Sequence, residues 1–291
     1  SVFDFKMGLS ATHERQFDEY GTNFIMETFG GLVYEYGLQE AIGRCLSEYN
    51  YIANFVYLTA EEEDEFQALT AEIKKVSYSR DTTSESSARK KWEMLCIKRR
   101  SLIESAQNKI ESFSNTLPRK NKKVQRSIVF CTDKNPRQLE LVNKELNNRG
   151  IKFHQITSSE TANNARLQQL VKLFCSGEIQ VLTSKKVLDE GFNVPQTEVA
   201  YFLASNTVRR QWTQRLGRVL RLSEDTGKAF ATIYDFIVIP QISDSPDDDL
   251  KSLLEGEYNR VEFFSKFSSN YSQSGGGYEA TEKLLNILRS S

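Results

Sequence analysis

Two arginines three positions apart, Arg218 and Arg221, are the residues of this sequence best suited to chemistry on phosphate groups. Side chains with this spacing on a helix reach the same side. A guanidinium group pairs with phosphate oxygens through two hydrogen bonds, and two such groups suit the stabilisation of a transferring phosphoryl group. An isolated pair of this kind is more often part of a surface helix with ordinary salt bridges. The surrounding residues therefore decide between the two interpretations.

The stretch that carries the arginines resembles a known motif, and three other stretches resemble its companions in order. Residues 214–221, QRLGRVLR, resemble motif VI (QxxGRxxR) of superfamily 2 helicases and translocases. Residues 183–195, TSKKVLDEGFNVP, are similar to motif V, residues 127–131 to motif IV and residues 8–12, GLSAT, to motif III. The closest resemblance is to the XPB-like and restriction-type branch, whose members typically act on DNA.

The resemblance implies a group of residues that face a nucleotide. Arg218 and Arg221 would face the phosphates of ATP, and Gln214 would support that contact. Three residues of the motif V stretch would lie at the nucleotide, near its ribose: Gly191, Asn193 and Asp189. The family often has Asp at the position of Asn193, so the charge of that contact is lost here while its hydrogen bond is kept.

The resemblance also implies contacts with nucleic acid and with another domain. The residues expected on the nucleic-acid backbone follow two predicted strands and are Thr183, Ser184, Lys185, Thr157 and Ser158. Ser10 and Thr12 would couple the nucleotide state to the other domain. His13 stands where the family often has Pro, and we interpret it as a neutral loop histidine.

The half of the family pattern that grips ATP is absent from this sequence. A P-loop, GxxxxGK(S/T), cradles phosphates, but Gly227-Lys228 is followed by Ala229, and Leu222 stands where the first glycine belongs. No acidic pair follows a buried strand to hold Mg²⁺. We therefore expect the cofactors ATP and Mg²⁺ to need P-loop and Mg²⁺ contacts from a missing N-terminal RecA-like lobe. We expect this chain alone to be inactive as an ATPase.

Apolar strands alternate with amphipathic helices over residues 127–240. This pattern predicts an α/β fold with a parallel sheet that is covered on both faces. The resemblance implies that this sheet is RecA-like and doubly wound, with an added helical segment and C-terminal helices. In such sheets ligands sit at the carboxyl ends of the strands. The predicted strands are 127–131, 151–156, 179–183, 199–204 and 229–236, and the helices between them are 135–150, 163–175 and 208–220. Elsewhere we expect helices over 38–51, 61–76, 88–113 and 250–267, a flexible link at 274–277, and a tail helix.

Composition shifts divide the chain into four predicted segments. Residues 1–58 would be the end of helicase lobe one and the connection between lobes, and residues 59–126 a helical basic arm. Residues 127–240 would be the RecA-like C-terminal domain, and residues 241–291 a helical tail.

The arm has a local surplus of positive charge. Residues 89–126 hold twelve Lys and Arg against three Glu, a surplus of nine in a chain of net charge −1. We expect a DNA-contacting surface formed by Lys90, Lys91, Lys98, Arg99, Arg100 and the Arg119–Lys123 cluster. The equally weighted alternative is a packing helix with a solvated basic face.

Composition excludes several classes of protein. No apolar run approaches the roughly 20 residues that span a membrane, so we expect no membrane partner. The two histidines and four dispersed cysteines argue against a zinc site or a histidine-based triad, and we expect no metal ligands in this chain. Dispersed cysteines favour reduced thiols, hence an intracellular location, cytoplasmic at the nucleoid if the source is bacterial.

The predicted function is that of the C-terminal half of an ATP-dependent DNA helicase or translocase. DNA is the expected partner, RNA also fits, and nuclease, methyltransferase or repair subunits are compatible with the resemblance. The alternative is a non-catalytic nucleic-acid-binding or regulatory module that retains the fold of lobe two. A dinucleotide-dependent enzyme is disfavoured because no GxGxxG follows a predicted strand.

Overall fold

The computed structural model describes residues 6–10, 18–77, 87–118, 124, 126–132, 136–156, 163–185, 194–204, 209–241 and 248–290. Within these ranges six strands form one sheet in the order β1-β6-β5-β2-β4-β3, and all neighbouring strands are parallel. The strands are β1 (Glu48–Tyr57), β2 (Ser127–Phe130), β3 (Phe153–Ile156), β4 (Val181–Ser184), β5 (Val199–Phe202) and β6 (Phe230–Ile239). The predicted α/β class with a doubly wound, RecA-like parallel sheet is confirmed.

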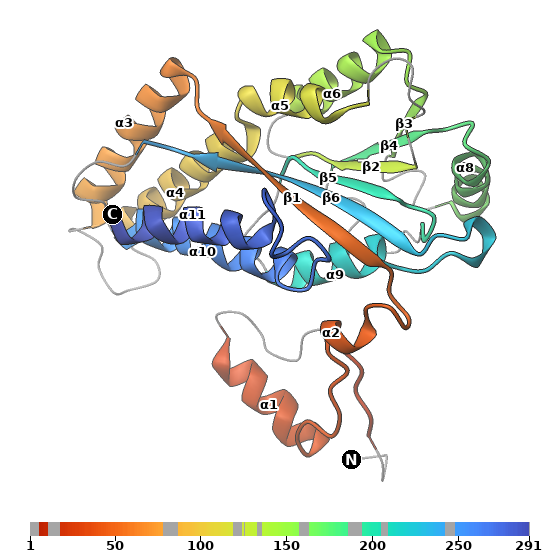
Figure 1. The fold of residues 1–291 in the computed structure, drawn as a ribbon. Helices are drawn as coiled ribbons and strands as arrows, with labels where there is room; N and C mark the ends of the chain where they lie inside the picture. The colour runs from red at the N-terminus through yellow and green to blue at the C-terminus, as the bar shows by residue number, and fades with distance from the viewer. Residues whose placement is uncertain are drawn as a thin grey trace.

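Helices cover both faces of this sheet (Figure 1). One apolar core takes side chains from α8 (Asn164–Ser176), α9 (Arg209–Val219), α10 (Asp248–Ser265) and α11 (Gly277–Ser290). The other core takes side chains from α3 (Ala60–Ser77), α4 (Ser87–Ser105), α5 (Asn108–Thr116) and α6 (Pro136–Asn148), and α10 also reaches it. Every residue of the short strands β2, β4 and β5 is buried, which explains why they are continuously apolar.

Local signals fix the ends of the helices between β2 and β4. The Asn163 side chain accepts hydrogen bonds from the backbone N–H groups of Ala165 and Arg166 at the start of α8. Gly150 and Gly177 follow the ends of α6 and α8 with φ of 67° and 77°, a region that favours glycine. These helices agree with the predicted ranges because their signals are local.

The helix expected over 38–51 is wrong. Only α2 (Leu38–Ala41) is helical there, and β1 begins at Glu48. The reason is the pairing of β1 with β6 along ten residues, which buries Tyr49 and Tyr51 completely. Residues two apart lie on the same face of a strand, so these tyrosines follow strand rather than helix periodicity.

The single helix expected over 88–113 is also wrong, because it is broken at Ala106-Gln107 into α4 and α5. The backbone N–H of Gln107 donates to Glu62 Oε1 of α3 at 2.9 Å. Asn108 then donates through Nδ2 to the Tyr57 carbonyl at the end of β1, also at 2.9 Å. These contacts turn the chain from α4, which packs on α3, to α5, which packs on the sheet.

The flexible link expected at 274–277 is instead a packed turn. The N–H of Gly276 donates to the Gln273 carbonyl at 2.9 Å, and the N–H of Tyr278 donates to the Tyr271 carbonyl at 2.9 Å. A side-chain carbon on Gly276 would clash with the Asn270 carbonyl oxygen. The glycines therefore permit a close approach of backbone segments, and α11 begins directly in this turn.

The N-terminal segment lies apart from these layers. Helix α1 (Glu19–Phe29) and α2 lie away from the sheet, beyond the first residue of β1 (Figure 1). Because β1 belongs to the same sheet as the strands of residues 127–240, that sheet extends outside the predicted third segment. The four segment boundaries stay predictions. Among the described residues, no helix is long and apolar enough to cross a membrane.

Candidate functional site

The end of α9 lies at the edge of the sheet where the strands begin. The N–H of Ser47, directly before β1, donates to the Leu220 carbonyl at 2.6 Å. Leu46 forms an isolated antiparallel bridge with Arg221. Helix α9 follows β5 and therefore runs back along the sheet, which brings its last residues to the amino edge. The arginine pair therefore lies at the edge opposite the carboxyl ends of the strands, where we expected ligands to sit.

The three residues of the arginine motif are arranged around the end of this helix. Gln214 and Arg218 are on α9 and are half-buried, whereas Arg221 is exposed and lies two residues beyond the helix. The two arginines therefore do not lie on one regular helix, as their spacing had predicted. Among the described residues, a side-chain carbon on Gly217 would meet nothing within 4 Å. The surface between Gln214 and Arg218 is thus open, and the close approach expected at Gly217 is not made by the described chain.

Arg215 is a buried cation of the same motif that the sequence analysis missed. Its Nη1 donates to the Ala204 carbonyl at 3.0 Å, and its guanidinium carbon lies 5.1 Å from the centre of the Phe130 ring. It thereby ties α9 to the chain just after β5. Helical spacing from the buried Trp212 and Val219 puts Arg215 on the inward face, and this spacing was the available signal.

At the carboxyl edge, two of the residues expected on nucleic acid have buried side chains. The Thr183 hydroxyl donates to Asn143 Oδ1 at 2.8 Å, and the Ser184 hydroxyl donates to the Lys185 carbonyl at 2.7 Å. Both residues are fully buried, and Lys185 alone of the three is partly exposed. The arginine pair and Lys185 therefore lie at opposite edges of one sheet.

Several predicted site residues lie outside the described residues, and nothing is said of their structure. They are Gly191, Asn193, Asp189, Thr157, Ser158 and Thr12. Ser10 is described and exposed, in the segment that precedes α1.

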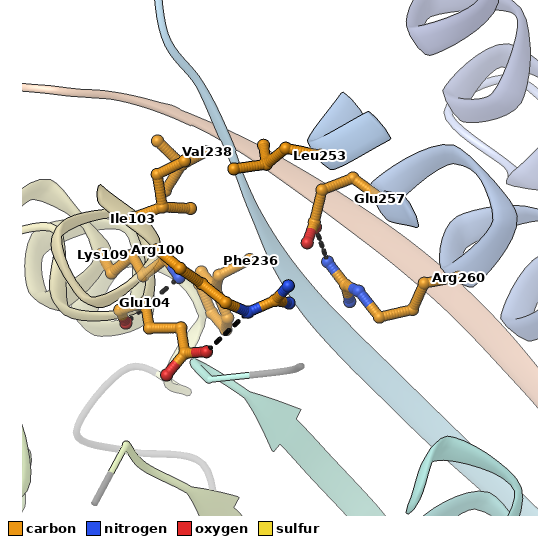
Figure 2. Close-up of a pocket in the computed structure, with 9 residues that line it drawn as sticks. All are labelled: Arg100, Ile103, Glu104, Lys109, Phe236, Val238, Leu253, Glu257 and Arg260. Atoms are coloured by element: carbon orange, nitrogen blue, oxygen red, sulfur yellow. Dashed lines mark hydrogen bonds and ion pairs between the residues drawn. The ribbon is translucent and has the colours of Figure 1, made fainter. Parts of the chain in front are cut away.

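A network of buried charges, which the sequence analysis did not foresee, lines a small cavity between α4, α5, β6 and α10 (Figure 2). Lys109 Nζ donates to the carbonyls of Leu203 at 2.7 Å and Glu104 at 3.3 Å. Arg260 forms ion pairs with Asp235 of β6 and with Glu257. Lys109 and Arg260 lie 151 residues apart in the sequence, so no local pattern indicates that they line the same cavity.

The network holds the start of the β5–α9 connection. Burial lowers the pKa of Lys109 to about 8, although the carboxylates of Glu257 and Glu104 favour its charged form. The small cavity beside it is lined by cations and anions in similar number and is about large enough for a single water. We interpret it as a structural feature.

The basic arm is only partly available for binding. Arg99 is buried, donates to Thr70 Oγ1 at 3.3 Å and lies over the Phe66 ring, while Arg100 pairs with Glu104 at 3.1 Å. The expectation that these two arginines contact DNA is not supported by their positions. The exposed lysines of α4 are Lys90, Lys91 and Lys98. The Arg119–Lys123 cluster lies outside the described residues.

The chain is similar to known helicase proteins. Residues 108–223 match the family described as helicase conserved C-terminal domain. The DNA 3'-5' translocase XPB2 of Sulfurisphaera tokodaii is 27% identical over 235 residues, which are 75% of this chain and 50% of that protein. The chain thus spans about half the length of this relative.

Solved helicase structures are more distant. The Hef helicase domain of Pyrococcus furiosus is 12% identical with a TM-score of 0.47, over 77% of this chain and 62% of that one. A DEAD box protein from Methanococcus jannaschii is 17% identical with a TM-score of 0.36, over 53% of this chain and 37% of that one.

Proposed function

We propose that this chain is the C-terminal lobe of a superfamily 2 helicase, and so one half of an ATP-driven DNA helicase or translocase. Its match to the helicase conserved C-terminal domain and its similarity to a DNA translocase support the proposal. The observation that carries the proposal is the position of the arginine motif. Its two arginines lie at and just beyond the end of α9, at the amino edge of the sheet. The chain there contacts Leu46 and Ser47, which lead back to the N-terminal segment. An incoming lobe joined to that segment would meet the arginines first.

The residues of this edge fit a triphosphate. Arg221 is exposed, Arg218 and Gln214 are half-buried, and the surface over Gly217 is open among the described residues. In the proposal Arg218 and Arg221 bind and orient the phosphate oxygens, with Gln214 in support, while Gly191, Asn193 and Asp189 lie at the ribose. ATP supplies the phosphoryl group whose transfer drives the motor. The described residues hold no metal-binding cluster of acids, so Mg²⁺ would be held by the other lobe.

The opposite edge is the proposed nucleic-acid side. Lys185 is partly exposed at the end of β4 and supplies a cation for a phosphate. Thr157 and Ser158 are proposed to contact the nucleic-acid backbone through their hydroxyl groups. Thr183 and Ser184 are buried, so their proposed role is to shape the strand end rather than to touch the nucleic acid directly. Separation of the two edges would let a nucleotide-driven movement at one edge shift the other.

The N-terminal segment supports a partner lobe. It exposes large apolar side chains, among them Tyr20, at 83%, and Val33, at 91%, and Met7, Leu9 and Phe24 are exposed as well. Exposed large apolar side chains gathered in one segment are typical of an interaction site. In the proposal it packs against the P-loop lobe, with Ser10 and Thr12 passing on the nucleotide state.

Replacing Arg218 tests this function. In the protein completed by a P-loop lobe, Arg218→Ala is expected to lower kcat for DNA-stimulated ATP hydrolysis about 10³-fold, because an arginine finger is worth about 10³ to 10⁵. Lys251→Met, at an exposed lysine of α10, is the matched loss of one surface cation and should leave kcat unchanged. Unaltered hydrolysis by Arg218→Ala would favour the alternative, a regulatory module that retains this fold.

A further inference from the structure

Lys228 occupies an unusual position for a lysine, between two separate segments of backbone. It lies two residues before β6 and is 6% exposed. Its ammonium group donates to the carbonyls of Pro195 at 3.1 Å, Arg221 at 2.9 Å and Val219. An ammonium group has three hydrogens to donate, so these carbonyls use its full capacity.

The contacts complete the hydrogen bonding of the end of α9. The last carbonyls of a helix have no partner within it. Lys228 donates to the carbonyls of Val219 and Arg221, and the Ser47 N–H donates to the carbonyl of Leu220 between them. Three successive carbonyls are thus held by donors from outside the helix. A cation at this position also interacts favourably with the helix dipole.

The third contact joins this end of α9 to a second segment. Pro195 lies two residues after residues 189–193, which are the proposed ribose-facing stretch. Lys228 therefore bridges the backbone that follows that stretch and the backbone that carries Arg221.

The charge of Lys228 is held at a cost. Burial lowers the pKa of Lys228 to about 8, and Glu198 offsets this effect only in part. An apolar side chain, however, would leave three carbonyls without this donor and would not link the two segments.

We propose that Lys228 is a positioning residue that fixes the arginine-bearing end of α9 relative to the segment at Pro195, and so sets where Arg221 meets the phosphates. The inference rests on the proposed function and deepens it, because it assigns a task to a residue that touches no nucleotide. A displacement of about 1 Å in such a group can lower a rate about 100-fold.

A double-mutant cycle tests this inference in the protein completed by a P-loop lobe. Lys228→Met is expected to lower kcat for DNA-stimulated ATP hydrolysis between 10-fold and about 100-fold. The same change made in an Arg221→Ala background should cause less than a 2-fold further loss, because Lys228 acts through Arg221. Lys228→Arg, which keeps donor hydrogens, should recover most of the rate, and Lys251→Met is the control.

Each other outcome overturns the inference in a recognisable way. A Lys228→Met protein that is folded by circular dichroism and fully active shows that the bridge is not needed. Equal fold losses in both backgrounds show that Lys228 does not act through Arg221. If Lys228→Met does not fold, Lys228→Gln, which keeps an amide donor but loses the charge, carries the same cycle. An Arg221→Ala protein as active as its parent instead refutes the proposed function itself, and the inference falls with it.

Discussion

At the residue scale, buried cations shape the candidate site more than the exposed ones do. Lys109 and Arg215 hold the start of the β5–α9 connection through the Leu203 and Ala204 carbonyls, and Lys228 holds the end of α9. The sequence pattern identified the arginine pair because motif spacing is local. It could not identify Lys109, because the carbonyl that it contacts lies 94 residues away.

The titration of Lys109 gives a testable pH dependence. Its pKa is about 8 in the folded protein against 10.5 for an ordinary lysine, so between these values the unfolded chain binds more protons. Stability must then rise with pH across this window. The charged groups that face it are Glu257, Arg260, Glu104 and Asp235.

We expect the free energy of unfolding of the parent to rise relative to Lys109→Met between pH 8 and pH 10.5. Urea denaturation of both proteins at several pH values measures the difference, in which the contributions of other groups cancel. Lys251→Met provides the comparison for an exposed lysine. Parallel curves for the parent and Lys109→Met would show that Lys109 does not titrate in this way.

At the element scale, helices with local signals were predicted well and long-range pairings were not. The caps at Asn163 and Gly177 are visible in the sequence, and α8 lies where they indicate. The start of strand β1 was predicted as part of a helix, because its pairing with β6 is not visible locally. Glu48, where β1 begins, pairs with Phe230, which lies 182 residues later. The break between α4 and α5 likewise depends on Glu62 in another helix.

Helix α9 offers a test that separates stability from function at Gly217. Alanine within a helix is favoured over glycine by roughly 0.5–1 kcal/mol, and the described structure has room for the added carbon. Gly217→Ala is therefore expected to raise the free energy of unfolding by about that amount, measured by chemical denaturation. It should lower ATP hydrolysis in the completed protein, since the open surface would then be partly filled. Lower stability would reveal a neighbour on this surface, and unchanged hydrolysis would show that the surface is not used.

At the scale of the whole molecule, the sheet separates the two proposed sites. The arginine pair stands at the amino edge beside the connection to the N-terminal segment, and Lys185 stands at the carboxyl edge. The fold class followed from alternating elements, but the edge at which the arginines lie required the path of α9 back across the sheet. The chain spans about half the length of its XPB2 relative, and the exposed apolar N-terminal segment is where we propose that the other half docks.

The most direct test of this account is DNA-stimulated ATP hydrolysis by three samples: this chain, a separately produced P-loop lobe, and their mixture. We predict steady hydrolysis in the mixture alone, because the proposed site needs the arginines of one half and the P-loop and Mg²⁺ ligands of the other. Steady turnover by a purified sample of this chain alone would contradict the account. So would a mixture of folded, associated halves that does not hydrolyse ATP.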